Sequence, residues 1–209
     1  MFNIDGKLMH VMNWITRLLY LQIIWVVFCL IGLLIGGIFP ATFTMFGISR
    51  KWIREDTEFP VFTTFKQMYK ESFLKANILG WWIVLLGFSL YYYYNLISSF
   101  TGMISIILIS LLITIVLLFL VTSLFIIPVY VHFDVRFLMV IRHAVTIAIS
   151  HPLHVLFMLV TVITFYYLML LVPGVFILIG ISSFTLVLMI IANLAFNNIE
   201  RKLNNNSIT

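Results

Sequence analysis

How this chain can fold is limited most by five long apolar stretches, residues 18–38, 77–97, 103–127, 153–171 and 173–196. Each is about 20 residues long or longer, the length that a helix needs to cross the hydrocarbon core of a bilayer. None contains Asp, Glu, Lys or Arg, and their one histidine, His154, stands at the edge of the fourth stretch. Membrane-spanning β-strands are only about 10 residues long and alternate apolar with polar residues. The sequence therefore predicts an all-α, polytopic membrane helix bundle with five transmembrane helices.

The composition agrees with a membrane protein and excludes several other classes. Of the 209 residues, 63% are hydrophobic and only 9% are charged, whereas soluble domains carry about 25% charged residues. Such a chain has too little polar surface to cover a water-soluble globule. This excludes a soluble enzyme, a nucleic-acid-binding domain and a disordered protein. We expect a single membrane domain over residues 1–209, surrounded by the lipid bilayer and without a nucleic-acid partner.

The basic residues indicate which helix ends face the cytoplasm. Six of the twelve lie in residues 39–76, two in residues 128–152 and two in the C-terminal tail, while the turns at 98–102 and 172–173 have none. Because cytoplasmic loops are enriched in Lys and Arg, we predict a multi-pass protein whose C-terminus is cytoplasmic. Five spans then place the N-terminus outside, together with Lys7 and Arg17. In the alternative, the first stretch re-enters with a break at Pro40, and the N-terminus is cytoplasmic.

Amphipathic segments accompany the apolar stretches at residues 4–17, 63–76 and 135–144. The second has aromatic residues on one side and lysines toward the other, and the third combines apolar residues with arginines. Both are predicted on the cytoplasmic face, where they could be attracted to anionic lipid or dock on a partner protein. The predicted partner-binding residues are Phe62, Phe65, Lys66, Tyr69, Lys70, Phe73, Arg136 and Arg142.

Tyrosines gather at the predicted outer ends of the second and fourth apolar stretches. Tyrosine is common at membrane interfaces, so an aromatic belt explains most of them. Four consecutive tyrosines point around the whole helix, however, so some face the protein interior, and tyrosine rings suit stacking on sugars. The predicted ligand contacts are Tyr91, Tyr92, Tyr93, Tyr94, Tyr166 and Tyr167.

Nothing in the sequence indicates catalysis. A phosphate-binding loop of the GxxxxGK[ST] type is absent, so we expect no direct nucleotide binding by that route. His151 and His154 have the i, i+3 spacing that can share a metal, but no Asp or Glu lies within a turn of them. We therefore predict no catalytic residue, no metal and no cofactor, and expect that the protein is not an enzyme.

Short motifs follow one another along the chain. The first apolar stretch ends in Phe39-Pro40-Ala41-Thr42, and Arg50-Lys51-Trp52 with Glu55 comes next. The aromatic and basic segment 62–73 follows, and later come Pro128 with Phe133-Asp134 and then Arg142-His143-Ala144. Together these motifs resemble the YesL-like family of bacterial membrane proteins. The likeness covers most of the chain and is strongest from residue 39 to residue 76.

The resemblance implies a five- or six-helix protein of the bacterial cytoplasmic membrane, often found beside carbohydrate ABC importers and without established catalytic residues. It therefore implies the permease subunits of such an importer as partners. Together with the missing nucleotide site, this favours a non-catalytic auxiliary or scaffold subunit of a carbohydrate ABC importer. The alternative is a small stand-alone membrane transporter or substrate-binding protein, with the tyrosine-rich site on its extracellular side.

Overall fold

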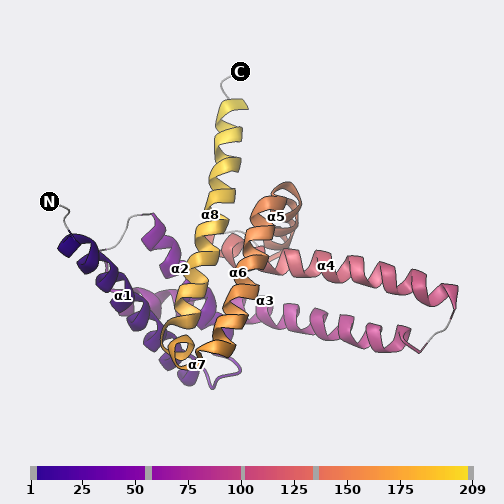
Figure 1. Cartoon of the computed structure of the whole chain (residues 1–209), viewed down its shortest axis with the longest axis horizontal. Coiled ribbons are helices and arrows are strands. Elements are labelled where there is room, and N and C mark those ends of the chain that lie inside the picture. Colours follow the sequence, from indigo (N-terminus) through magenta and orange to yellow (C-terminus); the bar gives the residue numbers. More distant parts are fainter. Residues whose placement is uncertain (1–3, 55–57, 100–101, 134–136, 207–209) are drawn as a thin grey trace.

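The part of the chain that the structure describes is helical, which confirms the predicted all-α fold. The structure, a computed structural model, describes residues 4–54, 58–99, 102–133 and 137–206, with side chains for all of these except 4–7, 137 and 199–206. Among these residues, five helical segments are long and apolar enough to cross a membrane by length and composition. The elements are α1 (Ile4–Ile31), α2 (Ile38–Ile53), α3 (Val61–Ile97), α4 (Met103–His132), α5 (Phe137–Ser150), α6 (Pro152–Leu171), α7 (Pro173–Val175), the π-helix η1 (Phe176–Gly180) and α8 (Ile181–Asn206) (Figure 1).

The first amphipathic segment and most of the first apolar stretch form one helix, α1. It ends at Ile31, earlier than predicted, and the chain then turns back through residues 32–37. Leu33 and Leu34 have positive φ angles of 56° and 59° in this turn. Gly37 permits the close return, because a Cβ on it would lie 2.5 Å from the carbonyl oxygen of Cys29.

α2 replaces the first part of the loop predicted over residues 39–76. Pro40 predicts a stop, but it lies in the first turn of α2, where backbone N–H groups have no partner within the helix and proline removes no hydrogen bond. The helix runs back along α1, and the rings of Trp14 and Trp52 meet with centroids 5.9 Å apart. α1 and α2 therefore form a hairpin, as in the re-entrant alternative, with the bend at residues 32–37 and not at Pro40.

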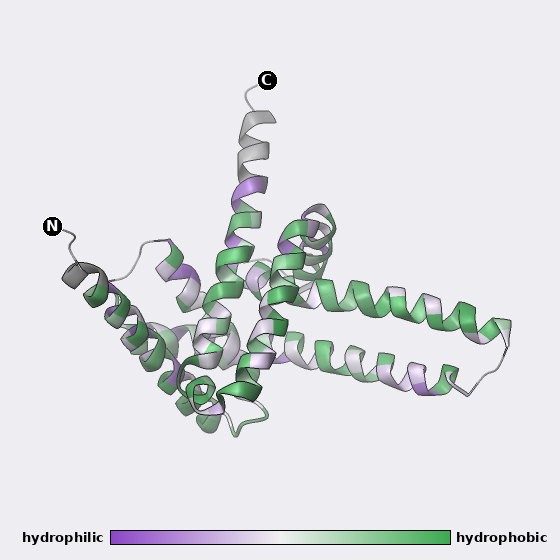
Figure 2. Cartoon of the chain, in the orientation of Figure 1, coloured by the Kyte–Doolittle hydropathy of each residue, from purple (hydrophilic) through white to green (hydrophobic). Residues whose placement is uncertain are grey.

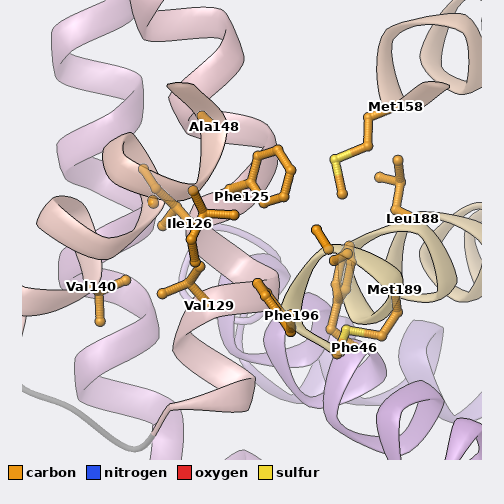
Figure 3. Packing of buried hydrophobic residues seen from close by; sticks show 14 of the residues in the cluster. Phe46, Phe125, Ile126, Val129, Val140, Ala148, Met158, Leu188, Met189 and Phe196 are labelled. Atoms are coloured by element: carbon orange, nitrogen blue, oxygen red, sulfur yellow. The ribbon is translucent and has the colours of Figure 1, made fainter. Parts of the chain in front are cut away.

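Hydrophobic packing covers α2 on two faces. Ten of its 16 residues are buried. One face packs against α1 and the first half of α3, through Ala41, Met45, Ile48 and Trp52. The other contributes Phe43 and Phe46 to a larger core that also contains residues of α3, α4, α5, α6 and α8. Figure 3 shows part of this core, with Phe46 of α2 beside Met189 and Phe196 of α8.

The second amphipathic segment and the second apolar stretch are one continuous helix, α3. It has 37 residues, which corresponds to about 55 Å. Every buried residue of α3 lies at or before Gly80, and among the buried residues of α4 only Leu112 lies before Thr122. The outer parts of the two helices, residues 81–97 and 103–121, form a hairpin that stands clear of the other helices (Figure 1). We name this hairpin the arm.

Many exposed residues of the arm are large and hydrophobic, and its α4 part is mostly hydrophobic (Figure 2). The arm runs across the direction of α6 and α8, which lie side by side (Figure 1). α4 continues through Pro128 to His132, beyond the end predicted at residue 127. Buried Pro128 removes one backbone hydrogen bond there, but its neighbours Ile126 and Val129 are packed into the core. Packing of the last turns of α4 therefore maintains the helix beyond the proline.

A side chain of α1 completes the backbone pairing at the start of α8. The π-helix η1 precedes α8 and interrupts the regular pattern of α-helical hydrogen bonds. Just beyond it, the backbone N–H of Ser182 donates to Oε1 of Gln22 at 3.0 Å, and both residues are buried. A buried N–H without a partner costs about 1–3 kcal/mol, so Gln22 stabilises both the helix start and the contact between α1 and α8.

We expect Phe125→Ala to lower the stability of the folded chain far more than Phe88→Ala. Phe125 is fully buried in the larger core, whereas Phe88 is exposed on the arm. Removing a buried phenyl ring costs about 3–5 kcal/mol, and a surface substitution about 0.5 kcal/mol or less. The unfolding midpoints of the purified variants in the same detergent measure the difference. Equal shifts for the two variants would contradict the described core.

Candidate functional site

The aromatic side of the predicted docking segment packs against α1. The ring centroid of Phe28 lies 5.0 Å from that of Phe65 and 4.9 Å from that of Tyr69. The Tyr69 hydroxyl donates to the backbone carbonyl of Phe28 at 3.3 Å. Because Phe65 and Tyr69 are buried, their side chains are not open to a partner. The other four predicted residues of this segment, Phe62, Lys66, Lys70 and Phe73, are exposed.

α3 presents one exposed face that continues from its start into the arm. The residues follow one another at helical spacing of mostly three or four positions, so successive members adjoin and the face turns gradually around the helix. The first part of this face carries lysines and aromatic rings, and the part beyond residue 76 is apolar or aromatic. We name it the α3 outer face, and its exposed members are Phe62, Lys66, Lys70, Phe73, Leu74, Ile78, Trp81, Leu85 and Phe88.

Of the two predicted arginines, the structure describes one, Arg142, and it does not extend this face. Arg142 is exposed on α5, a helix that packs against α4 and α6. Arg136 lies outside the described residues. The helix predicted over residues 135–144 is described from residue 137 and continues to residue 150. Its role in partner binding stays a prediction.

The six tyrosines are exposed but lie on two separate parts of the molecule. Tyr91–Tyr94 are on the arm, and Tyr166 and Tyr167 are on α6, which ends away from the arm (Figure 1). Tyr91 and Tyr94 line a groove of about 450 Å³ between α3 and α4. The rest of the groove is lined by Gly87, Leu90, Leu112, Ile113, Val116, Phe119 and Leu120. This lining is apolar, so the groove suits an acyl chain better than a sugar.

A second cavity lies between α2, α3 and α4 at the base of the arm, and we name it the base pocket. Its volume is about 300 Å³. Beside it, Arg50 donates from Nη1 to the backbone carbonyl of Val131 at 3.0 Å, which holds the end of α4 against α2. The pocket combines polar and apolar walls, and is lined by Phe43, Thr44, Met68, Glu71, Ser72, Lys75, Tyr130 and Val131.

The polar groups of the base pocket can form further hydrogen bonds and ion pairs with a ligand. The hydroxyls of Thr44 and Ser72 each donate at 2.7 Å to a carbonyl of their own helix, so their oxygens can still accept a hydrogen bond. Oε1 of Glu71 accepts a hydrogen bond from Nε2 of Gln67 at 2.9 Å. Within the described part of the chain, Lys75 makes no hydrogen bond and no ion pair. The pocket therefore presents an ammonium, a carboxylate and acceptor oxygens together.

Sequence reasoning missed the base pocket, because its residues come from three helices that are far apart in the chain. One local signal points to it. Glu71, Ser72 and Lys75 lie within a single helical turn, immediately before an apolar stretch. The third apolar stretch ends at the opposite wall, near Tyr130, but only the fold brings these two ends together.

The rings of His151 and His154 lie with centroids 5.6 Å apart at the start of α6. Across the described residues, no group of three or more His, Cys, Asp or Glu side chains is placed to hold a metal ion. The two histidines are neighbouring polar residues at a helix start.

We expect Phe65→Ala to be much more destabilising than Phe62→Ala, although both were predicted as contact residues of the same kind. Phe65 is 0% exposed and Phe62 is 48% exposed. The buried ring contributes about 3–5 kcal/mol, which unfolding in detergent measures. If Phe65→Ala left the midpoint unchanged, the packing of α3 against α1 would be wrong.

Comparisons with known proteins place the chain in a family. Residues 18–94 match the family described as "Protein of unknown function, DUF624". The chain is similar to three Bacillus subtilis (strain 168) proteins. It is 30% identical over 170 residues to "Uncharacterized protein YteU", over 81% of this chain and 76% of that protein. For "Uncharacterized protein YesL" the identity is 31% over 150 residues, 72% of this chain and 70% of that protein.

For "Uncharacterized protein YesV" the identity is 29% over 186 residues, which is 89% of each chain. No solved structure matches the chain. The resemblance to the YesL-like family is confirmed, and the chain belongs to the DUF624 family.

Proposed function

We propose that this member of the DUF624 family is a non-catalytic auxiliary subunit that docks on the permease subunits of a carbohydrate ABC importer in the bacterial cytoplasmic membrane. The observation that carries the proposal is the α3 outer face, which continues on one helix from a basic and aromatic part into the apolar arm. A permease subunit offers the matching surfaces, namely apolar transmembrane helices and polar segments at the membrane surface. The importer itself comes from the resemblance to the YesL-like family.

The shape of the arm supports docking over a role in a compact bundle. Its two helices bury few residues of their own, and the arm stands clear of the remaining helices (Figure 1). Its apolar residues therefore face either lipid or the helices of another membrane protein. The lysines at the start of the α3 outer face add positive charge, which favours a partner surface of negative charge.

The test is purification of the tagged chain from native membranes in mild detergent. We expect permease subunits of an importer to be recovered with it, and their absence would overturn the proposal. Leu85→Trp on the α3 outer face should reduce their recovery at least about tenfold, the equivalent of about 1.4 kcal/mol. The matched control is Leu170→Trp on α6, because Leu85 and Leu170 are 64% and 61% exposed. Equal recovery with both variants would rule out this face.

The hairpin of α1 and α2 also supports a topology for the N-terminus. Trp14 lies against Trp52, next to the basic end of α2 with Arg50, Lys51 and Arg54. If that end is cytoplasmic, as the positive charges favour, the start of α1 is cytoplasmic as well. Lys7 and Arg17 then lie on the same side as the other ten basic residues. We propose this arrangement in place of an N-terminus outside.

Cysteine labelling tests the topology in a Cys29→Ala background. A membrane-impermeant maleimide applied to intact cells should label Leu171→Cys, because the proposed topology places the last residue of α6 outside. It should not label Met9→Cys, which the same topology places in the cytoplasm. Both positions are exposed, so accessibility within the protein does not limit the reaction. After permeabilisation both should react. Labelling of Met9→Cys in intact cells would show that the N-terminus is outside.

A further inference from the structure

The lining of the base pocket combines side chains of opposite charge with hydroxyl groups. It brings together the ammonium of Lys75, the carboxylate of Glu71 and acceptor hydroxyls of Ser72 and Thr44. A purely anionic ligand would be repelled by Glu71, and a purely cationic one by Lys75. A group that carries a negative and a positive charge a short distance apart complements both.

The pocket lies where the polar and apolar parts of α3 meet. Lys75 comes two residues before the start of an apolar stretch that has no charged residue up to residue 97. In a bilayer this boundary is the level of the lipid headgroups. The polar wall of the pocket therefore lies beside headgroups, and the apolar surface of the arm begins next to it.

From these two observations we propose that the base pocket binds the phosphoethanolamine headgroup of a zwitterionic phospholipid. Lys75 binds the phosphate, since a charged donor to a phosphate oxygen forms a strong hydrogen bond. The ammonium of the ligand donates to Glu71 and to the hydroxyls of Ser72 and Thr44. The volume of about 300 Å³ is at the lower end of small-molecule sites, which suits a headgroup. This inference does not depend on the proposed function.

Donor chemistry distinguishes this headgroup from two others. The trimethylated ammonium of a choline lipid has no N–H to donate to Glu71, Ser72 or Thr44. A glycerol headgroup has no positive charge to offset Glu71. The pocket should therefore prefer a phosphatidylethanolamine over a phosphatidylcholine and a phosphatidylglycerol with the same acyl chains.

Native mass spectrometry of the full chain, released from nanodiscs that contain equal parts of these three lipids, tests the preference. We expect phosphatidylethanolamine to be retained about tenfold more than either of the others, a ratio typical of one charge-assisted contact. Equal retention of the three lipids, or a preference for either of the others, would overturn the proposal. In a second arm, soluble glycerophosphoethanolamine is titrated against the detergent-purified chain. Binding as tight as that of the lipid would show that the site takes a free metabolite and would overturn the lipid assignment.

Variants locate the preference at the pocket. Glu71→Gln should abolish the discrimination against phosphatidylglycerol, and Lys75→Gln should weaken retention of phosphatidylethanolamine about tenfold. Lys70→Gln is the matched control, because Lys70 is exposed on the same helix but does not line the pocket. Glu71 and Lys75 are also exposed, so the variants should keep the elution profile and unfolding midpoint of the parent chain. Unchanged lipid ratios in both pocket variants would place the bound lipid elsewhere.

Discussion

The burial of α2 on two opposite faces is the constraint on which the rest of the structure depends. A helix of 16 residues spans about 24 Å and contributes too little apolar surface to hold a bundle from its edge. Placed in the middle, it belongs to both hydrophobic clusters at once, with Met45 and Trp52 in one and Phe43 and Phe46 in the other. The first half of α3 packs mainly against it, whereas α1 also contacts η1 and α8 directly.

The position of α2 also explains how polar side chains near it find hydrogen-bond partners. Thr44 is buried but donates to the carbonyl of Pro40, and Arg50 reaches the end of α4 through the carbonyl of Val131. Polar side chains of a membrane protein must find such partners, because a buried group without one costs free energy. The base pocket is formed where α3 and α4 diverge from this central helix, so its polar wall is a consequence of the packing around α2.

The sequence predicted the parts of the fold that local composition determines. Apolar runs without charges were sufficient to find five membrane-spanning candidates. α2 was missed because Thr44, Ser49 and a proline interrupt a short apolar run, and only contacts with distant helices bury it. Pro40 and Pro128 were both interpreted as helix ends, although a proline in a first turn breaks no hydrogen bond and tertiary packing maintains α4 beyond the other. The base pocket could not be predicted, since Thr44, Lys75 and Tyr130 approach one another only after α2, α3 and α4 have packed.

The length of α3 gives the molecule a beam that is held at one end and free at the other. Gly80 marks the edge of the support, because a Cβ at this position would collide with the ring of Phe39 on α2 and the buried residues of α3 lie at or before it. About 26 Å of helix extends beyond Gly80 to the end of α3, and about 29 Å extends back to Val61. The half before Gly80 is fixed against α1 through Phe65 and Tyr69. A sideways load on the arm is therefore concentrated near Gly80, and the start of α3 stays in place.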